Sequence, residues 1–256
     1  MTDNEDFSHE TPTMSLCGRN FFFSGTYRSY GHVPPCIESH GWPDYDHVNG
    51  ETRTDYIVLG PNDRFFRCRR FHKGDLAAQN TSDLEDYEEV TDLFDEHDVE
   101  RPAFFCLGPN GSFYARAENG AEKWNLSAEI VSNALQVTPT ATQSGIQSLW
   151  LGVRGSWVAQ YRDGTFNFDL KGQYAGLERV LRQALEEEVR IHGLALNVLD
   201  GTSYACVLAD GLVQYEAGQA GFNGQEFEKW CEENYDLKDL QRLLAEINEA
   251  TRNNRR

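Results

Sequence analysis

One pattern of glycine turns and alternating aromatic residues recurs along the chain and constrains the fold more than any other feature. Its clearest copy consists of Leu151-Gly152, Ser156-Trp157, Asp163-Gly164 and Phe168. The same anchors recur without a gap in an earlier copy, at Leu107-Gly108, Ser112-Phe113, Asn119-Gly120 and Trp124. A later copy aligns, again without a gap, at Val198-Leu199, Ser203-Tyr204, Asp210-Gly211 and Tyr215. A further copy opens at Leu59-Gly60, and a weakly marked one at Gly25 with Ser29-Tyr30. A period of roughly 20 to 50 residues is typical of propellers, solenoids and repeat arrays.

Each repeat predicts three short strands joined by tight turns. Asn-Gly and Asp-Gly favour type I′ hairpin turns, because both central residues take positive φ. This predicts hairpins at Asn119-Gly120, Asp163-Gly164 and Asp210-Gly211. Gly60-Pro61-Asn62-Asp63 and Gly108-Pro109-Asn110-Gly111 predict further turns, with proline presetting φ at the second position. Residues 157–162 alternate in character, which predicts a half-buried strand. The unit is therefore a three-stranded meander.

Helices are expected after several of the meanders. Leu84, Tyr87, Val90 or Thr91, and Leu93-Phe94 recur near helical spacing in an acidic segment over 83–100. Ser127 is a plausible N-cap for a second helix over 127–136. A third is expected over 175–192, with Gly193 as its C-terminal stop. Further helices are expected near the C-terminus.

The predicted fold class is therefore β-rich α+β, built from four to five tandem meander-plus-helix repeats. The repeat domain is expected over 17–217, with units near 17–53, 54–101, 102–146, 147–193 and 194–217. Residues 1–16 are expected to form a disordered tail, and 218–256 a helical segment that packs on the last unit. A propeller-like ring is favoured over an open stack, because closure removes exposed sheet edges. An open stack would need the C-terminal helix as a cap, and a pentein-like ring of strands and helices is a further arrangement.

Charge and composition restrict the partners. The net charge of −18 disfavours nonspecific binding to nucleic acid or an anionic membrane, because such binding needs clustered Lys and Arg. No apolar run reaches the roughly 20 residues of a transmembrane helix, and residues 1–6 do not have the pattern of a signal peptide. The six cysteines are scattered, which favours a reducing, intracellular and cytoplasmic setting. No cofactor is expected.

Two local clusters have both a functional and a structural interpretation. His32, Cys36, His40 and His47 form the only metal-like group, and zinc accepts such ligands. The neighbouring prolines argue against a helix there, so loop residues without metal are favoured. Arg64, Arg67, Arg69 and Arg70 are interleaved with aromatic residues, as in a phosphate-binding surface. Charge compensation by the acidic segment over 83–100 is favoured over anion binding.

The repeat also resembles a known group of sequences. Leu-Gly-Pro-Asn-Gly-Ser-Phe-Tyr at 107–114, followed by Asn119-Gly120 and Trp124, is similar to tandem Leu-Gly-Pro-x-Gly-aromatic repeats of uncharacterised fungal proteins. The resemblance covers 54–217 and implies a β-rich repeat domain. It implies no activity and no site.

Recognisable catalytic motifs are missing from the sequence, including G-x-S-x-G, H-E-x-x-H, the P-loop and G-x-G-x-x-G. Ser112, Ser156 and Ser203 recur at one repeat position, which favours hydrogen bonding in turns over a nucleophile. The candidate ligand-binding residues are three pairs in the third strands: Trp124 with Asn125, Phe168 with Asp169, and Tyr215 with Glu216. Within a pair the side chains take opposite faces, so aromatic residues are expected in the core and polar ones on a surface where several units converge. Exposed aromatic residues would instead predict stacking on sugars.

The predicted function is a non-enzymatic protein-interaction or scaffold module. The alternative is a lectin-like propeller that binds a carbohydrate or another small ligand. An enzyme with a site at the centre of the ring is a third hypothesis. The partner is thus expected to be a protein or a carbohydrate, and no oligomeric state is predicted.

Overall fold

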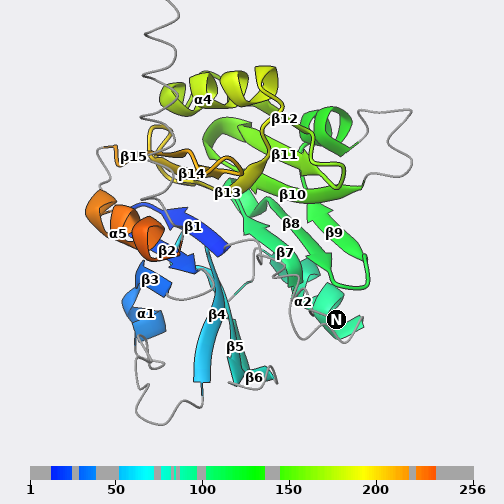
Figure 1. Cartoon of the computed structure of the whole chain (residues 1–256). Helices are drawn as coiled ribbons and strands as arrows, with labels where there is room; N and C mark the ends of the chain where they lie inside the picture. The colour runs from blue at the N-terminus through cyan, green and yellow to red at the C-terminus, as the bar shows by residue number, and fades with distance from the viewer. Residues whose placement is uncertain are drawn as a thin grey trace, which may run out of the picture.

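The described residues of the protein form five three-stranded antiparallel sheets, and each sheet contains strands that are consecutive in the sequence (Figure 1). The structure is a computed structural model that describes residues 13–24, 29–38, 52–71, 76–81, 84, 87–96, 102–135, 145–218 and 223–234. Sheet one contains β1 (Thr13–Cys17), β2 (Asn20–Ser24) and β3 (Ser29–His32), and sheet two contains β4 (Thr52–Leu59), β5 (Phe65–Phe71) and β6 (Leu76–Thr81). Sheet three contains β7 (Pro102–Leu107), β8 (Phe113–Ala117) and β9 (Glu122–Asn125), and sheet four contains β10 (Ile146–Leu151), β11 (Trp157–Tyr161) and β12 (Phe166–Asp169). Sheet five contains β13 (Ile191–Leu196), β14 (Tyr204–Leu208) and β15 (Val213–Glu216). The predicted β-rich architecture of repeated meanders is confirmed.

The hairpins between second and third strands form where predicted, but their turn type differs from the prediction. Only the glycine of each pair has positive φ, at 90° for Gly120, 86° for Gly164 and 83° for Gly211. The backbone N–H of Gly120 donates to Ala117 O at 3.0 Å, as in a three-residue loop that ends on a left-handed glycine. The residue before each glycine has another role. Asn119 Oδ1, Asp163 Oδ1 and Asp210 Oδ1 each accept the backbone N–H two residues on, at 2.9 Å. Asn and Asp therefore serve here as hydrogen-bond acceptors rather than as positive-φ residues.

Helices follow the sheets along the chain. They are α1 (Pro35–Glu38), α2 (Glu88–Glu96), α3 (Ala128–Ile130), which continues as a π-helical turn over Val131–Leu135, α4 (Ala175–Glu186) and α5 (Gly224–Asn234). The first and third strands of a meander run in the same direction, so the chain has to return along the sheet before the next unit begins. A helix of the length of α4 spans about 18 Å, and a five-residue strand spans roughly 17 Å. Such a helix is therefore long enough to carry the chain back along the sheet. Figure 1 shows α4 and α5 at the outside of the molecule.

Apolar cores lie between the sheets, so most strands of the described units are covered on both faces. One cluster lies between sheets one and two, and others lie between two and three, three and four, and four and five. Each of them includes residues from the helical segment that connects the two sheets. A fifth cluster joins Phe227, Trp230 and Cys231 of α5 to Phe23 of sheet one and Val207 of sheet five. Within the segment expected over 218–256, α5 therefore packs on the first sheet as well as on the last, and residues 235–256 lie outside the described residues.

Several local predictions are confirmed. Val90 is buried and Thr91 is exposed, which decides between the two core candidates of the acidic helix α2. Ser127 caps α3, because its Oγ accepts the backbone N–H of Ile130 at 3.3 Å. Phe21-Phe22-Phe23 forms the buried centre of β2.

Other local predictions are wrong at their boundaries. The disordered tail expected over 1–16 does not include its last four residues, because β1 begins at Thr13 and Met14 to Leu16 are buried; residues 1–12 lie outside the described residues. The prolines near residue 35 do not exclude a helix, since α1 begins at Pro35, a first-turn position that needs no backbone N–H.

The third predicted helix also ends early. α4 ends at Glu186, and Gly193 lies in β13 rather than at a helix end. The stop is Glu188, which has a φ of 56°. The backbone N–H of Val189 donates to Ala184 O at 2.8 Å and that of Glu188 to Leu185 O at 3.4 Å, which is the Schellman arrangement.

The gapless alignment of the last copy is also wrong at its first strand. Leu196 pairs with Tyr204 as Leu151 pairs with Trp157, so Leu196 and not Val198 occupies the position of Leu151. The connection over 197–203 is therefore two residues longer than that over 152–156. Leu199, predicted as a strand anchor, is 57% exposed in this connection.

Candidate binding face

The turns between the first and second strands of the five sheets form the most regular surface feature, here called the turn face. It comprises residues 18–19, 60–64, 108–112, 152–156 and 197–203, between the strands of sheets one to five. In sheet three Asn110 and Gly111 both have positive φ, at 57° and 71°. In sheet four Arg154 and Gly155 have φ of 56° and 76°, and in sheet two Asn62 and Asp63 have 59° and 56°. Two consecutive positive-φ residues were predicted for the turns between second and third strands. They are found instead in these turns between first and second strands.

Hydrogen bonds hold these turns in one shape. In sheet three Ser112 N donates to Pro109 O at 3.1 Å, and Gly108 N donates to Ser112 O at 2.7 Å. In sheet four the same two bonds run from Ser156 N to Val153 O at 3.0 Å and from Gly152 N to Ser156 O at 2.8 Å.

The recurring serines strengthen the turns, as predicted. Ser112 Oγ donates to Pro109 O at 2.7 Å, and Ser156 Oγ donates to Val153 O. Ser203 Oγ donates to Ala217 O at 2.8 Å. The hydroxyls of Ser112 and Ser156 bond to the backbone of their own turns, and the hydroxyl of Ser203 also contacts Asp200 Oδ2 within turn five.

Successive turns contact one another at their bases. Cys17 Sγ donates to Gly60 O at 3.0 Å, which links turns one and two. A Cβ at Gly60 would lie 2.8 Å from Leu107 Cδ1, and one at Gly108 would lie 3.0 Å from Leu151 Cβ. At Gly60 the close approach of the next sheet therefore favours glycine, whereas at Gly108 the tightest contact of an added Cβ would be with Ser112 Oγ of the same turn.

The contacts continue from turn four to turn five through Tyr174. Its hydroxyl accepts the backbone N–H of Val153 at 3.1 Å and donates to Asn197 O at 2.7 Å. Burial raises the pKa of Tyr174, which keeps the donor protonated.

Turn five in turn contacts turn one. Asn197 Oδ1 accepts Gly18 N at 2.9 Å, and Asn197 Nδ2 donates to Gly18 O at 2.7 Å. Leu16 and Asn197 also form a parallel β-bridge. Asn197 is fully buried, so both bonds are shielded from water.

The tips of the turns carry different residues on this common frame. Arg19, Asn62, Asn110, Arg154 and Leu199 are exposed at the tips of turns one to five. Asn is the residue that tolerates positive φ best after glycine, so Arg154 is unusual at its position. Turns two to four therefore present two amides and one cation at equivalent positions, and turns one and five add Arg19 and Leu199 on loops of other lengths.

Two hollows adjoin this face. One, of about 300 Å³, lies between turns three and four and includes Asn110, Asn125, Ser127 and Arg154 in its lining. A narrower cavity of about 100 Å³ is lined by residues from the first strands of all five sheets, mainly apolar ones. Arg116 reaches this cavity and donates through Nη2 to Gln147 O at 2.9 Å.

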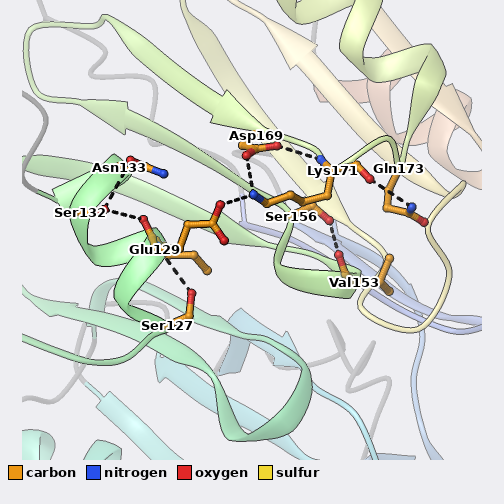
Figure 2. A network of polar contacts seen from close by, with 10 residues as sticks. Ser127, Glu129, Ser132, Asn133, Val153, Ser156, Asp169, Lys171 and Gln173 are labelled. Carbon is orange, nitrogen blue, oxygen red and sulfur yellow. Dashed lines mark hydrogen bonds and ion pairs between the residues drawn. The ribbon is translucent and has the colours of Figure 1, made fainter.

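A polar network lies beside the 300 Å³ hollow and connects α3 to the end of sheet four (Figure 2). Lys171 Nζ pairs with Asp169 Oδ2 at 2.7 Å and with Glu129 Oε1 of α3. Lys171 N also donates to Asp169 Oδ1 at 3.0 Å. The hydrogen bond from Lys171 lowers the pKa of Asp169, and hydrogen bonds to Asp169 and Glu129 raise the pKa of Lys171. All three groups are partly exposed, so the network contributes little stability and serves mainly to fix the local geometry.

The predicted aromatic site residues do not converge. Trp124 is 40% exposed, so the expectation of a core position is wrong for it. Phe168 packs against the cluster between sheets four and five, and Tyr215 packs against the cluster that contains α5, so the expectation is right for these two. Arg182 covers the ring of Phe168 at 5.8 Å, and Tyr215 donates to Glu228 Oε1 at 2.7 Å.

The polar partners of these residues also lie apart. Asn125 donates to Gly111 O at 3.0 Å and lines the hollow between turns three and four. Asp169 belongs to the network with Lys171, and Glu216 lines a separate open groove with Arg179 of α4. The register places all three at equivalent positions, opposite Phe113, Trp157 and Tyr204, but each lies on the outer strand of a different sheet.

The metal-like and basic clusters are only partly described. His32 is exposed on β3 and Cys36 lies in α1, while His40 and His47 fall outside the described residues. Within the described ranges, no group of three or more His, Cys, Asp or Glu is arranged to hold a metal ion. Arg67 is fully buried, and the side chains of Arg69 and Arg70 are outside the described set.

The described cysteines Cys17, Cys106, Cys206 and Cys231 are free thiols. Burial raises the pKa of Cys17, Cys106 and Cys206 to about 12. These thiols are therefore protonated near neutral pH and act as small buried side chains.

Comparison with known proteins identifies no family. No family model matches the chain, and no curated protein matches it. Among solved structures, a catalytically inactive virginiamycin B lyase from Staphylococcus aureus aligns at a TM-score of 0.26 and 9% identity, over 81% of this chain and 65% of that one. A streptogramin B lyase aligns at a TM-score of 0.24 and 12% identity, over 80% of this chain and 62% of that one. The chain thus spans a little under two thirds of the length of these lyases.

In the part of the chain that the structure describes, no helix has the length and apolar character needed to cross a membrane.

Proposed function

We propose that the protein is a non-enzymatic protein-interaction module in which five sheets close into a propeller-like ring and the turn face binds a partner protein. Closure is supported by the contact of turn five with turn one through Asn197 and Gly18. It is further supported by the core cluster that α5 forms with both sheet five and sheet one. A ring leaves fewer open sheet edges than a stack of the same units.

The observation that carries the interaction role is a constant frame with variable tips. Turns two to four share backbone conformation and internal hydrogen bonds and expose Asn62, Asn110 and Arg154, whereas Arg19 and Leu199 are exposed on turns of other lengths. Rigid loops of different chemistry on a common scaffold are typical of recognition surfaces.

The tips also indicate the chemistry of the partner. Arg19 and Arg154 place two cations on a protein with a net charge of −18. Leu199, 57% exposed, supplies an apolar contact. Arg is enriched at hot spots of protein interfaces, and the buried core of an interface is more apolar than its rim. We therefore propose a partner with an apolar patch bordered by carboxylates.

The test compares two double variants of matched composition. Arg154→Asn with Leu199→Gln alters the turn face, and Arg154→Asn restores the residue found at this position in turns two and three. Arg179→Gln with Leu185→Gln removes an exposed arginine and an exposed leucine from α4. The partner is identified by crosslinking and mass spectrometry with the unmodified protein, and its affinity for each variant is measured by titration calorimetry. We expect at least a tenfold loss for the turn-face variant and less than a twofold change for the α4 variant. Equal effects of the two variants would refute the assignment.

The lectin-like alternative has weaker geometric support. A sugar site on every unit requires comparable exposed aromatic residues, but Phe168 is covered by Arg182 and Tyr215 packs on Phe227. Only Trp124 offers an exposed ring among the three. A glycan array in which Trp124→Ala abolishes binding would favour this alternative over the interaction role.

A further inference from the structure

We propose that a hollow between sheets four and five, at the hairpin end opposite the turn face, binds a monosaccharide or a cyclic polyol. The hollow has a volume of about 160 Å³, room for roughly five waters. Its lining includes Ser148, Trp150, Gln160, Arg190 and His192. None of the ligand-binding residues predicted from the sequence belongs to it.

The register of sheet four creates this hollow. Ser148 is the direct cross-strand partner of Gln160, and Trp150 is the partner of Val158. These four residues share one face of the sheet, because side chains alternate along a strand. Trp150 and Val158 belong to the apolar cluster against sheet five, whereas Ser148 and Gln160 form the next layer towards the hairpins. The apolar interface therefore gives way to a polar layer at this end.

Gln160 is the central observation. Its side chain is only 5% exposed, and its Oε1 is buried without a hydrogen-bond partner. Buried amide groups in native proteins almost always have partners. Gln160 lines the hollow, so a ligand there that donates to Oε1 after a small rotation of the amide would supply the partner that this oxygen lacks. A ligand hydroxyl is such a donor, and it can also accept a hydrogen bond from a neighbouring group.

The repeat itself does not require glutamine at this position. The register places Arg116 of sheet three and Val207 of sheet five at the equivalent places. Val207 is buried in an apolar cluster, and Arg116 donates to a backbone carbonyl. A valine would thus satisfy the packing, and the amide of Gln160 adds a polar group that the fold does not use.

The surrounding groups favour a neutral hydroxylated ligand. Ser148, 3% exposed, provides a hydroxyl beside the amide, and Arg190 provides donors at the rim. Trp150 provides a ring surface suited to the C–H groups of a sugar. Arg190 already donates to Asp163 O at 3.3 Å, and the net charge of −18 opposes the approach of an anion. Together these features select for hydroxyls rather than for a carboxylate or a phosphate.

The experiment is a titration of the full-length protein with D-glucose, D-galactose, D-mannose, myo-inositol and glycerol. Binding is measured by calorimetry and by saturation-transfer NMR. We expect one of the cyclic compounds to saturate the protein with a Kd on the order of 1 mM, and glycerol to bind more weakly. Gln160→Met keeps the side-chain volume and removes the amide, so we expect at least a tenfold loss of affinity. Its melting temperature should remain unchanged or rise, because a buried oxygen without a partner is removed. Gln214→Met on β15 is the matched control at an exposed site and should bind as the unmodified protein does.

The proposal has clear negative outcomes. If no compound of the panel saturates the protein, the hollow holds water only and the proposal is wrong. It is equally wrong if Gln160→Met binds as tightly as Gln214→Met. Ser148→Ala provides a second, smaller change in the same layer, and we expect it to weaken binding at least threefold.

Discussion

The link between Asn197 and Gly18 allows the sharpest test of how the molecule is held together. Asn197 is fully buried, exchanges two hydrogen bonds with Gly18 and accepts a third from Leu199 N at 3.1 Å. Asn197→Ala removes all three and leaves backbone groups of Gly18 without partners. A net value of about 1 kcal/mol for each bond predicts a loss of about 3 kcal/mol. For a chain of this size that corresponds to a fall in Tm of about 6 to 12 °C.

The assay is urea unfolding followed by tryptophan fluorescence and far-UV circular dichroism, with a thermal scan as a second measurement. Asn133→Ala, at an exposed position of the π-helical turn, is the matched control and should change stability by less than about 0.5 kcal/mol. Asn197→Asp keeps the acceptor to Gly18 N and places an oxygen against Gly18 O, so we expect it to destabilise as well. A loss below about 1 kcal/mol for Asn197→Ala would refute the reasoning, because the contact between the first and last units would then carry no stability.

Three further changes follow from single contacts. Glu188→Gly should stabilise the protein by about 0.5 kcal/mol in urea unfolding, because glycine adopts the φ of 56° without strain, and Glu188→Ala should give no gain. Trp230→Ala should cost about 3 to 5 kcal/mol, since this fully buried ring joins α5 to the first sheet; a loss comparable to that of an exposed site would show that α5 does not support the core. The lowered pKa of Asp169 means that its pairing with Lys171 stabilises the folded state above the ordinary carboxyl pKa of about 4 and that this contribution is lost as the pH falls below it. Comparison of the unmodified protein with Lys171→Met between pH 3 and 7 measures the effect, and a difference that persists unchanged at the acidic end contradicts it.

The repeated meanders could be predicted from the sequence because turn chemistry is local. A glycine after Asn or Asp restricts the backbone within a few residues, so the hairpin positions were right in three copies. Their turn type was wrong because the same dipeptide fits two loops that differ by one residue in register. The end of α4 could not be predicted from local sequence, because nothing in the neighbouring residues indicates that Glu188 takes the left-handed conformation that ends the helix.

Burial could not be predicted in the same way because it depends on what covers each sheet. The alternation over 157–162 predicted a half-buried strand, but Val158 is fully buried and Gln160 is 5% exposed. Sheet four packs against neighbours on both faces, so Gln160 does not face water, whereas Arg162 at the end of the alternation is exposed. For the same reason Asn197 could not be distinguished from an ordinary turn residue, since its partner Gly18 lies 179 positions away in sequence.

Differences between equivalent positions point to function only where a ligand can reach them. Arg67 stands where sheets three, four and five have Ala115, Ala159 and Cys206, which makes it the most divergent residue of the second strands. It is fully buried, so a phosphate surface built on it is not accessible in this structure. Arg154 differs just as clearly from Asn110, but it lies exposed on a turn that keeps the same backbone. The replacement of asparagine by arginine at that tip has no structural benefit, because arginine tolerates positive φ less well. An exposed residue that costs local stability fits the proposed recognition role of the turn face, whereas the buried Arg67 is not accessible to a ligand.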